Sequence, residues 1–297
     1  MKDQQAPSGI LLLDKPAGIT SNAALGRAKR IIGIKKAGHT GTLDPMASGL
    51  LALCFGQATK VAGFLLDADK TYEAEACLGV TTDSEDAEGE VLERKAVPAL
   101  DEAAIEAVLA RFRGAIEQVP PMHSALKHKG QRLYDLARKG ETVERPPRAV
   151  VIHELELIDH DEQSLRLKVT CSKGTYIRSL ARDIGEALGC GAHLSGLRRT
   201  ASAPFDIRDS VELEALESLT RDQARALLAP PDRALEHLPA VELDEQQAAR
   251  MAQGQRLAGL RASHSGQVRI YGPGTFLGVG EMDGMGHLKP VRLFTAG

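Results

Sequence analysis

Short runs of alternating apolar and polar residues are the feature that most limits what this chain can fold into. The alternation covers residues 72–78 and 165–171, and continuous apolar runs cover residues 10–13 and 50–55. Alternation predicts strands with one buried face, whereas short continuous apolar runs predict strands buried on both faces. Because these segments are far apart in a chain of 297 residues, we expect a sheet assembled from distant parts of the sequence.

Helical spacing also occurs, but it does not alternate regularly with the strands. Apolar residues recur every three or four positions in residues 21–32, 105–112 and 177–188, and the acidic stretch 209–232 also favours helix. Regular strand–helix–strand units would indicate a parallel α/β sheet. Their absence predicts a mixed α+β fold.

Two changes in composition divide the chain. Proline pairs at 120–121 and 146–147 bracket a basic segment, which predicts an insertion of about residues 120–148 that stands off the core. From about Pro239 onward, short β-type runs separated by glycine predict a small β-rich domain. We therefore expect one domain over residues 1–238 and a second over residues 239–297.

The net charge of −3 argues against a generally polybasic protein, but the charges are segregated. Residues 27–36 hold five basic residues and no acid, and residues 165–200 and 123–148 are also strongly basic. Acidic residues are concentrated in residues 82–93 and 209–245. Each basic cluster alone is compatible with an ordinary solvated face, whereas together they are compatible with a groove for a polyanion.

Missing sequence features exclude several classes of protein. The first residues do not resemble a signal peptide, and no apolar run is long enough for a membrane span. The four cysteines form no CxxC pair, and P-loop, Rossmann, HExxH and GxSxG motifs are absent. We expect a soluble, cytoplasmic protein without metal or cofactor, whose chemistry comes from carboxylates, tyrosine, histidine and arginine.

The segment GHTGTLDPMASG at residues 38–49 is the densest candidate for chemistry. Asp44 precedes a proline, which biases it towards extended backbone, and Gly41 and Gly49 allow a large ligand to approach closely. The spacing alone favours a simple turn at the Asp-Pro step.

Four sequence blocks resemble the TruB-type pseudouridine synthases, and they occur in that family's order. The segment 38–51 resembles the catalytic loop, and GILLLDKP at 9–16 resembles the first motif. KTYEAEACLG with TTDSEDAEG, at 70–89, resembles the second, and the stretch 172–199 resembles the third. The resemblance covers most of residues 9–205. It implies a pseudouridine synthase fold with a mixed, mostly antiparallel sheet, followed by a PUA-like RNA-binding domain.

The resemblance implies an isomerase that acts on the T-loop uridine of tRNA, at position 55. Asp44 would be the catalytic residue, attacking C1′ of the ribose, attacking C6 of the base, or acting on the C2′ proton. Arg178 would pair with Asp44 and keep it ionised and oriented, although its position alone fits a helix-surface charge. Tyr72 would stack on the uracil and take part in proton transfer, although a core tyrosine is equally natural there.

The same resemblance implies further substrate-binding residues. Tyr176 and Leu197 would line the uracil pocket, and His39 would fill the space left when the base is extruded. Lys15 would support the loop or contact the RNA backbone. Without the resemblance, Leu197 fits a core position and His39 a solvated loop.

The expected partner is the T-arm stem-loop of tRNA, held by the basic clusters at 27–36, 127–148 and 173–199 and clamped by the insertion. We expect no membrane, no obligate protein partner and a monomer. An RNA-binding or RNA-folding module and a carboxylate hydrolase remain as alternative functions. They differ in outcome, since the hydrolase would release free uracil and the module would leave the nucleoside unchanged.

Overall fold

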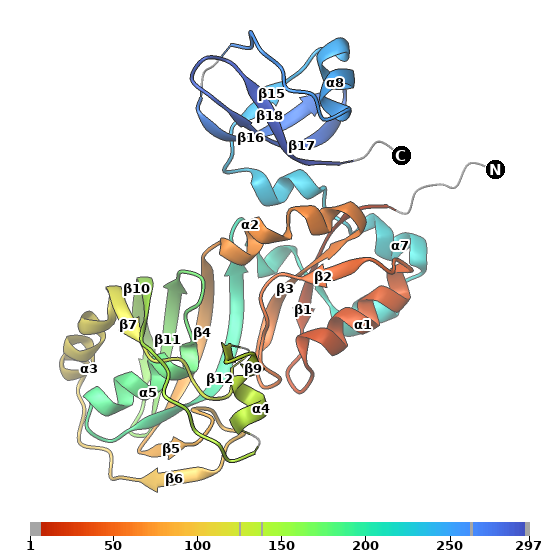
Figure 1. The fold of residues 1–297 in the computed structure, drawn as a ribbon. Coiled ribbons are helices and arrows are strands. Elements are labelled where there is room, and N and C mark those ends of the chain that lie inside the picture. The colour runs from red at the N-terminus through yellow and green to blue at the C-terminus, as the bar shows by residue number, and fades with distance from the viewer. Residues whose placement is uncertain (1–6, 125, 138, 262–263, 295–297) are drawn as a thin grey trace.

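The computed structural model describes residues 7–124, 126–137, 139–261 and 264–294. Its main feature is a 10-stranded sheet with the order β14-β1-β3-β12-β4-β11-β10-β7, with β13 paired to β12 and β2 paired to β3 (Figure 1). The strands are β1 Gly9–Lys15, β2 Ala37–His39, β3 Ser48–Phe55, β4 Lys70–Leu78, β7 Gly114–Gln118, β10 Arg148–His160, β11 Ser164–Cys171, β12 Ala192–Ser202, β13 Phe205–Asp206 and β14 Val211–Glu212.

The sheet is mixed and mostly antiparallel, which confirms the predicted α+β class. Only the pairs β1–β14 and β3–β12 are parallel among the described strands of this sheet. All the strands predicted from alternation or apolar runs are present as β1, β3, β4 and β11. The central strand β12 and the long strand β10 were not predicted, and β2 lies where only a loop was expected.

Helices cover one face of the sheet in two groups. The first group is α3 (Glu102–Leu109) with α5 (Ile177–Ala187), and the second is α1 (Ser21–Ile32) with α6 (Leu213–Glu217) and α7 (Arg221–Ala226). Each group closes its own hydrophobic core against the strands beneath it. The acidic stretch predicted as one helix is therefore two short helices.

Two half-buried side chains, Tyr72 and Leu197, pack against both of these cores. They lie on the adjacent central strands β4 and β12, where the two helical groups meet. The junction of the two cores therefore exposes an apolar floor that neither core covers completely.

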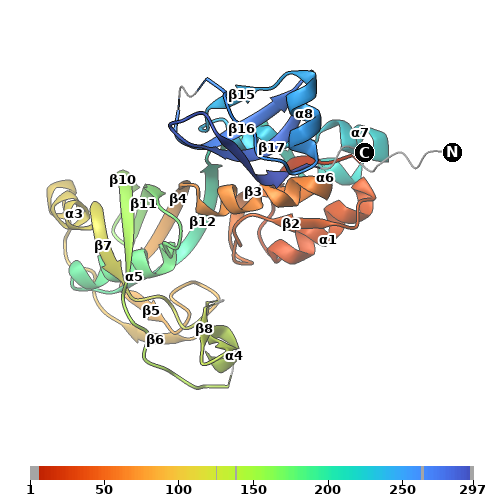
Figure 2. The same cartoon turned by 45° about the horizontal axis from the view of Figure 1, so that its top comes forward.

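The opposite face of β1 and β3 packs against α2 (Ala62–Asp67) and the C-terminal region. That region is a separate four-stranded sheet with one helix, which Figure 2 shows above the β1–β3 edge of the main sheet. Its elements are β15 Ala240–Glu242, α8 Glu245–Ala252, β16 Gly266–Gly272, β17 Thr275–Met282 and β18 Leu288–Leu293. Val279 joins the same buried cluster as Ile10 and Leu50, so the two parts share apolar contacts.

The insertion stands apart from the main sheet. Its described part contains the hairpin β8 (Lys127–His128) and β9 (Gln131–Arg132), followed by α4 (Leu133–Ala137). A second small hairpin, β5 (Val80–Thr82) with β6 (Val91–Arg94), lies near it in Figure 1. No helix among the described residues is long and apolar enough to cross a membrane.

Candidate active site

Asp44 lies in the loop between β2 and β3, residues 40–47, which we call the Asp44 loop. The loop is held to its surroundings through its backbone, since Gly18 N donates to Pro45 O at 2.8 Å. Gly49, at the start of β3, has φ of 103°, and a Cβ there would lie 2.3 Å from the backbone oxygen of Arg199. Only glycine fits this close approach of β3 to β12. The Asp44 side chain keeps 38% of its surface exposed.

Arg178 is the partner of Asp44. Its guanidinium Nε lies 3.0 Å from Asp44 Oδ2, and Nη1 lies 3.2 Å from Asp86 Oδ2. The remaining hydrogen bonds go to backbone oxygens, with Nη1 donating to Ser84 at 3.0 Å and Nη2 to His123 at 2.8 Å. The Arg178 side chain is only 6% exposed. A buried guanidinium bound on every side thus holds a carboxylate that is only partly exposed.

Burial raises the pKa of Asp44, whereas the nearby positive charges lower it. Its pKa is raised above the ordinary value of 3.8, chiefly because burial disfavours the ionised form, and the nearby Asp86 adds to the rise. Arg178 and, more weakly, Lys15 oppose it. Arg178 therefore limits the rise in the pKa rather than depressing the pKa below its ordinary value. A carboxylate of this kind is a better base and nucleophile than one in water.

Three further candidates surround this pair. Tyr72 and Leu197 form the floor at the junction of the two cores, and burial raises the pKa of the Tyr72 phenol. Tyr176 immediately precedes α5, which carries Arg178. Burial raises the pKa of Tyr176 also, and Asp44 is close enough to contribute to that rise. These two tyrosines therefore keep their protons at neutral pH.

His39 lies on β2 at the edge of the Asp44 loop. It is half-buried, and its Nδ1 has no hydrogen-bond partner among the described residues. Burial and the charge of Arg199 lower its pKa, so the imidazole is neutral at neutral pH. A neutral half-buried ring is suited to packing against a flat apolar surface rather than to pairing with phosphate.

Lys15 is completely buried at the end of β1. Its ammonium donates to the backbone oxygens of Pro16 and Ile19, each at 2.8 Å. Burial lowers its pKa to about 8, against the opposing effect of Asp44. Of the two roles expected for Lys15, these contacts fit support of the chain beside the Asp44 loop.

Arg199 is a residue whose place the sequence did not reveal. It is 1% exposed, and it donates from Nε to Leu50 O at 2.6 Å and from Nη2 to Gly41 O at 3.1 Å. These bonds tie the beginning of the Asp44 loop to β3. The phosphate-binding role expected of the basic cluster 173–199 is therefore wrong for Arg199, which is buried, whereas Arg178 pairs with Asp44 as the resemblance implies.

Two carboxylates from the acidic stretch 82–93 were also missed. Asp86 is 4% exposed and bound to Arg178. Glu85 is 8% exposed, accepts a hydrogen bond from Ser179 at 2.6 Å and forms an ion pair with Arg182. An acidic run is usually a solvated face, but the centre of this one is bound to α5. The available signal was its position inside the second motif.

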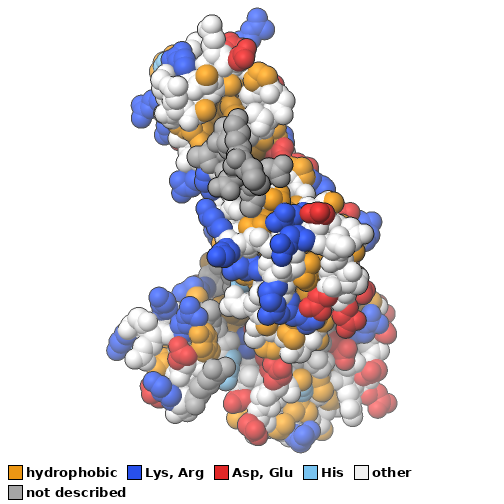
Figure 3. Space-filling model, turned by 90° about the vertical axis from the view of Figure 1, so that its right-hand side faces the viewer, with side chains coloured by type: hydrophobic (Ala, Val, Ile, Leu, Met, Phe, Trp, Pro, Cys, Tyr) orange, Lys and Arg blue, Asp and Glu red, His pale blue; other side chains and the backbone are white. Residues whose placement is uncertain are grey.

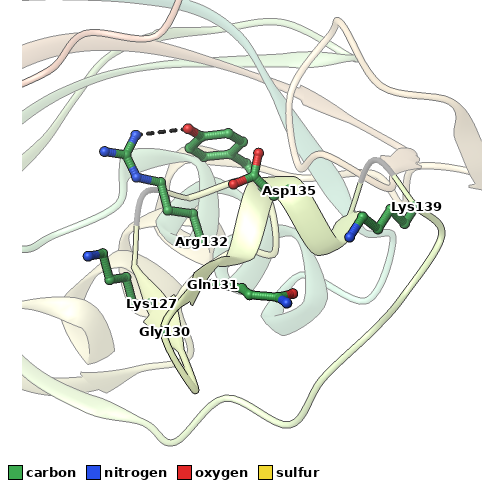
Figure 4. Close-up of a pocket in the computed structure, with 7 residues that line it drawn as sticks. Lys127, Gly130, Gln131, Arg132, Asp135 and Lys139 are labelled. Atoms are coloured by element: carbon green, nitrogen blue, oxygen red, sulfur yellow. Dashed lines mark hydrogen bonds between the residues drawn. The ribbon is translucent and has the colours of Figure 1, made fainter.

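The insertion carries a basic cavity away from Asp44. Its volume is about 690 Å³, and its lining includes Lys127, Arg132 and Lys139 with one acid, Asp135. Figure 4 shows Arg132 donating to the hydroxyl of Tyr134, while Lys127 and Lys139 lie on either side. Among the described residues, no cluster of three or more His, Cys, Asp or Glu side chains could hold a metal ion.

Comparisons with known proteins match nearly the whole length of the chain. The model of the TruB family pseudouridylate synthase N-terminal domain matches residues 29–177. Two C-terminal family models follow it, the tRNA pseudouridylate synthase B C-terminal domain at 178–236 and the pseudouridine synthase II TruB C-terminal domain at 239–294.

Curated relatives show the same likeness. The tRNA pseudouridine synthase B of Aromatoleum aromaticum is 54% identical over 285 residues, covering 96% of this chain and 92% of the relative. That of Stutzerimonas stutzeri is 53% identical, covering 96% of this chain and 95% of the relative.

Solved structures match the fold. An H/ACA ribonucleoprotein bound to a substrate RNA containing 2′-deoxyuridine contains a chain with 27% identity and a TM-score of 0.74, covering 97% of this chain and 85% of that one. A Cbf5-Nop10-Gar1 complex contains one with 28% identity and a TM-score of 0.73, covering 97% and 84%.

Proposed function

This chain belongs to the TruB family of pseudouridine synthases and is an enzyme that isomerises uridine of tRNA to pseudouridine, and we propose that the uridine is the one at position 55, in the T-loop. The single observation that carries the proposal is the solvent-accessible carboxylate of Asp44 held at 3.0 Å by the buried guanidinium of Arg178. The four motifs that resemble the family converge on this pair.

Asp44 is the catalytic residue of this proposal. The reaction breaks the bond between N1 of uracil and C1′ of ribose and joins C5 of the same uracil to C1′, so no atoms are gained or lost. Asp44 contributes by attacking C1′, by attacking C6 of the base or by taking the C2′ proton. In each route Arg178 orients the carboxylate before the substrate arrives, which removes the cost of arranging it during the reaction.

The surroundings of Asp44 fit an extruded base. Tyr72 and Leu197 offer an apolar floor on which uracil can pack, and Tyr176 lies on the Arg178 side of the pair. Extruding a base from a folded loop costs roughly a few kcal/mol. The neutral imidazole of His39 would offset part of that cost by filling the vacated space.

Exposed basic side chains supply the RNA-binding surface in this proposal. Figure 3 shows Lys and Arg side chains on the middle of the main body and on the lobe beside it, with a hollow between them. We assign that lobe to the insertion, residues about 120–148, which would clamp the T-arm by contacts to phosphates.

We place the boundary between the catalytic and PUA-like domains after residue 238. The separate sheet that begins at Ala240 and the family match that begins at residue 239 support this division. Residues 1–6 and 295–297 of the two proposed domains lie outside the described residues. The PUA-like domain would add contacts to RNA beyond the T-loop.

We further propose that the chain acts in the cytoplasm as a monomer, without a cofactor or an obligate protein partner. An isomerisation needs no redox carrier or group donor, which supports the absence of a cofactor. The residues proposed for the Asp44 site all come from a single chain, which supports the monomer. Gel filtration with light scattering, with and without T-arm RNA, would test the monomer.

A T-arm RNA assay tests the function. The enzyme is incubated with the T-arm stem-loop and with a matched RNA that has cytidine in place of the T-loop uridine. After digestion, mass spectrometry of the first RNA should show an unchanged mass and a carbon-linked nucleoside, and the second RNA should be unaltered. Release of free uracil would instead indicate a hydrolase, and tight binding without any altered nucleoside would indicate an RNA-binding module.

A further inference from the structure

Gln118, the last residue of β7, makes two hydrogen bonds to one backbone residue. Its Nε2 donates to Tyr176 O at 3.0 Å, and its Oε1 accepts from Tyr176 N at 2.8 Å. The side chain is 2% exposed, so water cannot easily replace either bond. A side-chain amide carries both a donor and an acceptor, and here both are used on the same residue. Gln118 therefore fixes the position and the orientation of Tyr176.

This contact lies at the beginning of the helix that carries Arg178. Tyr176 is the N-terminal cap residue of α5 and provides no side-chain cap bond. Gln118 Oε1 instead accepts from the N–H of the cap residue itself, which is one of the four N–H groups that have no partner within the helix. Because Arg178 is the second residue of α5, a displacement of Tyr176 would move Arg178 with it. The ion pair between Arg178 and Asp44 has a length of 3.0 Å and little room for such a shift.

The same helix also binds the beginning of the insertion. Gln118 lies just before the insertion, and Pro120 and Pro121 are buried. Arg178 Nη2 donates to His123 O at 2.8 Å. The segment that leads into the insertion, residues 118–123, is thus attached to α5 at both ends, through Gln118 and through Arg178 itself. A displacement of the insertion would therefore also displace the guanidinium of Arg178, which holds Asp44.

We propose that Gln118 is a positioning residue for the isomerisation: it locks the beginning of the insertion to the first turn of α5 and so keeps Arg178 in place to hold Asp44 when RNA engages the insertion. The proposal rests on the proposed function, because the rate of pseudouridine formation is its main readout. Gln118 acts through Arg178 and does not contact the substrate itself. Errors of an ångström in such positioning can cost two orders of magnitude in rate.

The first experiment separates rate from binding. Gln118→Met keeps the volume of the side chain and removes both hydrogen bonds. We expect its single-turnover rate constant at saturating T-arm RNA to fall about 10- to 100-fold, with the Kd for RNA within about threefold of the wild type. The control is Glu117→Ala, which changes the exposed neighbour on the same strand and should leave both quantities unchanged. An unchanged rate in folded Gln118→Met would overturn the proposal.

A double-mutant cycle tests whether Gln118 acts through Arg178. In an Arg178→Lys background, Gln118→Met should slow the reaction by less than about threefold, because the geometry that it protects is already lost. In a His39→Ala background the full 10- to 100-fold effect should persist, since His39 lies on β2 and has no bond to α5. Equal effects in both backgrounds would contradict the proposed route.

Two further measurements keep the test decisive. If Gln118→Met does not fold, Gln118→Asn retains an amide that is too short to reach both backbone atoms, and it should show the same fall in rate with unchanged Kd. Hydrogen exchange at the backbone amide of Tyr176 should be faster in either variant than in the wild type. An exchange rate equal to that of the wild type would show that Gln118 does not hold Tyr176 in place. If the wild type forms no pseudouridine, the proposed function fails, while hydrogen exchange still decides whether Gln118 fixes α5.

Discussion

The Asp44 site and the insertion use charged residues in opposite ways. At the site, Arg178, Asp86 and Arg199 are buried and bound by neighbouring groups, and Tyr72 and Leu197 pack there against two large cores. The insertion has a core of only three buried apolar residues, Met122, Leu133 and Leu136, among those described. Its Lys127 and Arg132 are exposed around an open cavity.

The difference follows from what each region has to do. Chemistry on a nucleoside needs groups whose positions are fixed before the substrate arrives, and only a dense core and a complete set of hydrogen bonds provide that. Binding phosphates needs exposed cations, and a small core leaves them free to adapt. The largest contrasts between the regions should therefore appear when the buried charges are removed.

The largest effect is expected for Arg178→Met. It removes the group that orients Asp44 and leaves Asp86 buried without its partner. We expect the single-turnover rate to fall about 1,000-fold and the free energy of unfolding to fall by about 3 kcal/mol. Arg132→Met in the insertion is the matched control and should lower the free energy of unfolding by less than about 0.5 kcal/mol. Similar losses for both arginines in rate and in urea unfolding would remove the contrast between the regions.

The next contrast concerns the two cores. Leu180 on α5 is 1% exposed in the large core, and Leu136 on α4 is 6% exposed in the small core of the insertion. Leu180→Ala should lower the free energy of unfolding by about 3 kcal/mol, and Leu136→Ala by about 1 kcal/mol or less, because a small core has fewer contacts to lose. Urea denaturation measures both, and equal losses would show that the insertion is as firmly built as the main body.

A smaller effect is expected in RNA affinity. The double change Lys127→Ala with Arg132→Ala should weaken the Kd for T-arm RNA about 10-fold and lower the slope of log Kd against log salt by about 1.5. The single-turnover rate at saturating RNA should stay within about twofold. The control, Arg111→Ala with Arg166→Ala, removes the same charge near the ends of β7 and β10 that lie away from the insertion. It should change neither the Kd for RNA nor its salt dependence. A slower chemical step in the first double variant would contradict the division of roles.

The smallest effect is a shift in pH dependence. Because the pKa of Asp44 is raised above 3.8, the acid limb of the rate profile should lie above that value. At a pH between 3.8 and the raised pKa of the folded protein, Asp44 binds its proton more tightly in the folded protein than in the unfolded chain. The contribution of Asp44 to stability therefore falls as the pH rises from 3.8 to the raised pKa. Asp86→Asn removes a charge that raises this pKa, so the limb should move to lower pH. A limb that moves to higher pH would show that Asp86 acts mainly through Arg178.

The sequence predicted the parts of the fold that depend on local pattern. Alternation located β4 with Tyr72, and helical spacing located α5 with Arg178. It missed β12 because Arg198 and Arg199 interrupt the apolar pattern. Their charges are compensated by distant groups, Arg198 by Asp14 at 2.6 Å and Arg199 by backbone oxygens near Asp44. Such compensation exists only after folding.

Other omissions had a local signal that was not used. Helix α8 begins with a capping box in which Asp244 and Gln247 bond to each other's backbone, and this spacing is visible in the sequence. For Asp86 the residue spacing gave no such signal, because an acidic run is usually a solvated face, and only its position inside the second motif marked it. The family resemblance supplied Asp44 and Arg178, whereas Gln118 became visible only through its bonds to Tyr176.

The most direct test of the role of Asp44 is a single-turnover measurement on Asp44→Asn with T-arm RNA. The amide keeps the size of the side chain but loses its charge and its ability to attack or to take a proton. We expect pseudouridine formation to fall by at least about 10,000-fold, while the Kd for RNA stays within about threefold of the wild type. Pseudouridine formation at the wild-type rate would show that Asp44 is not the catalytic residue.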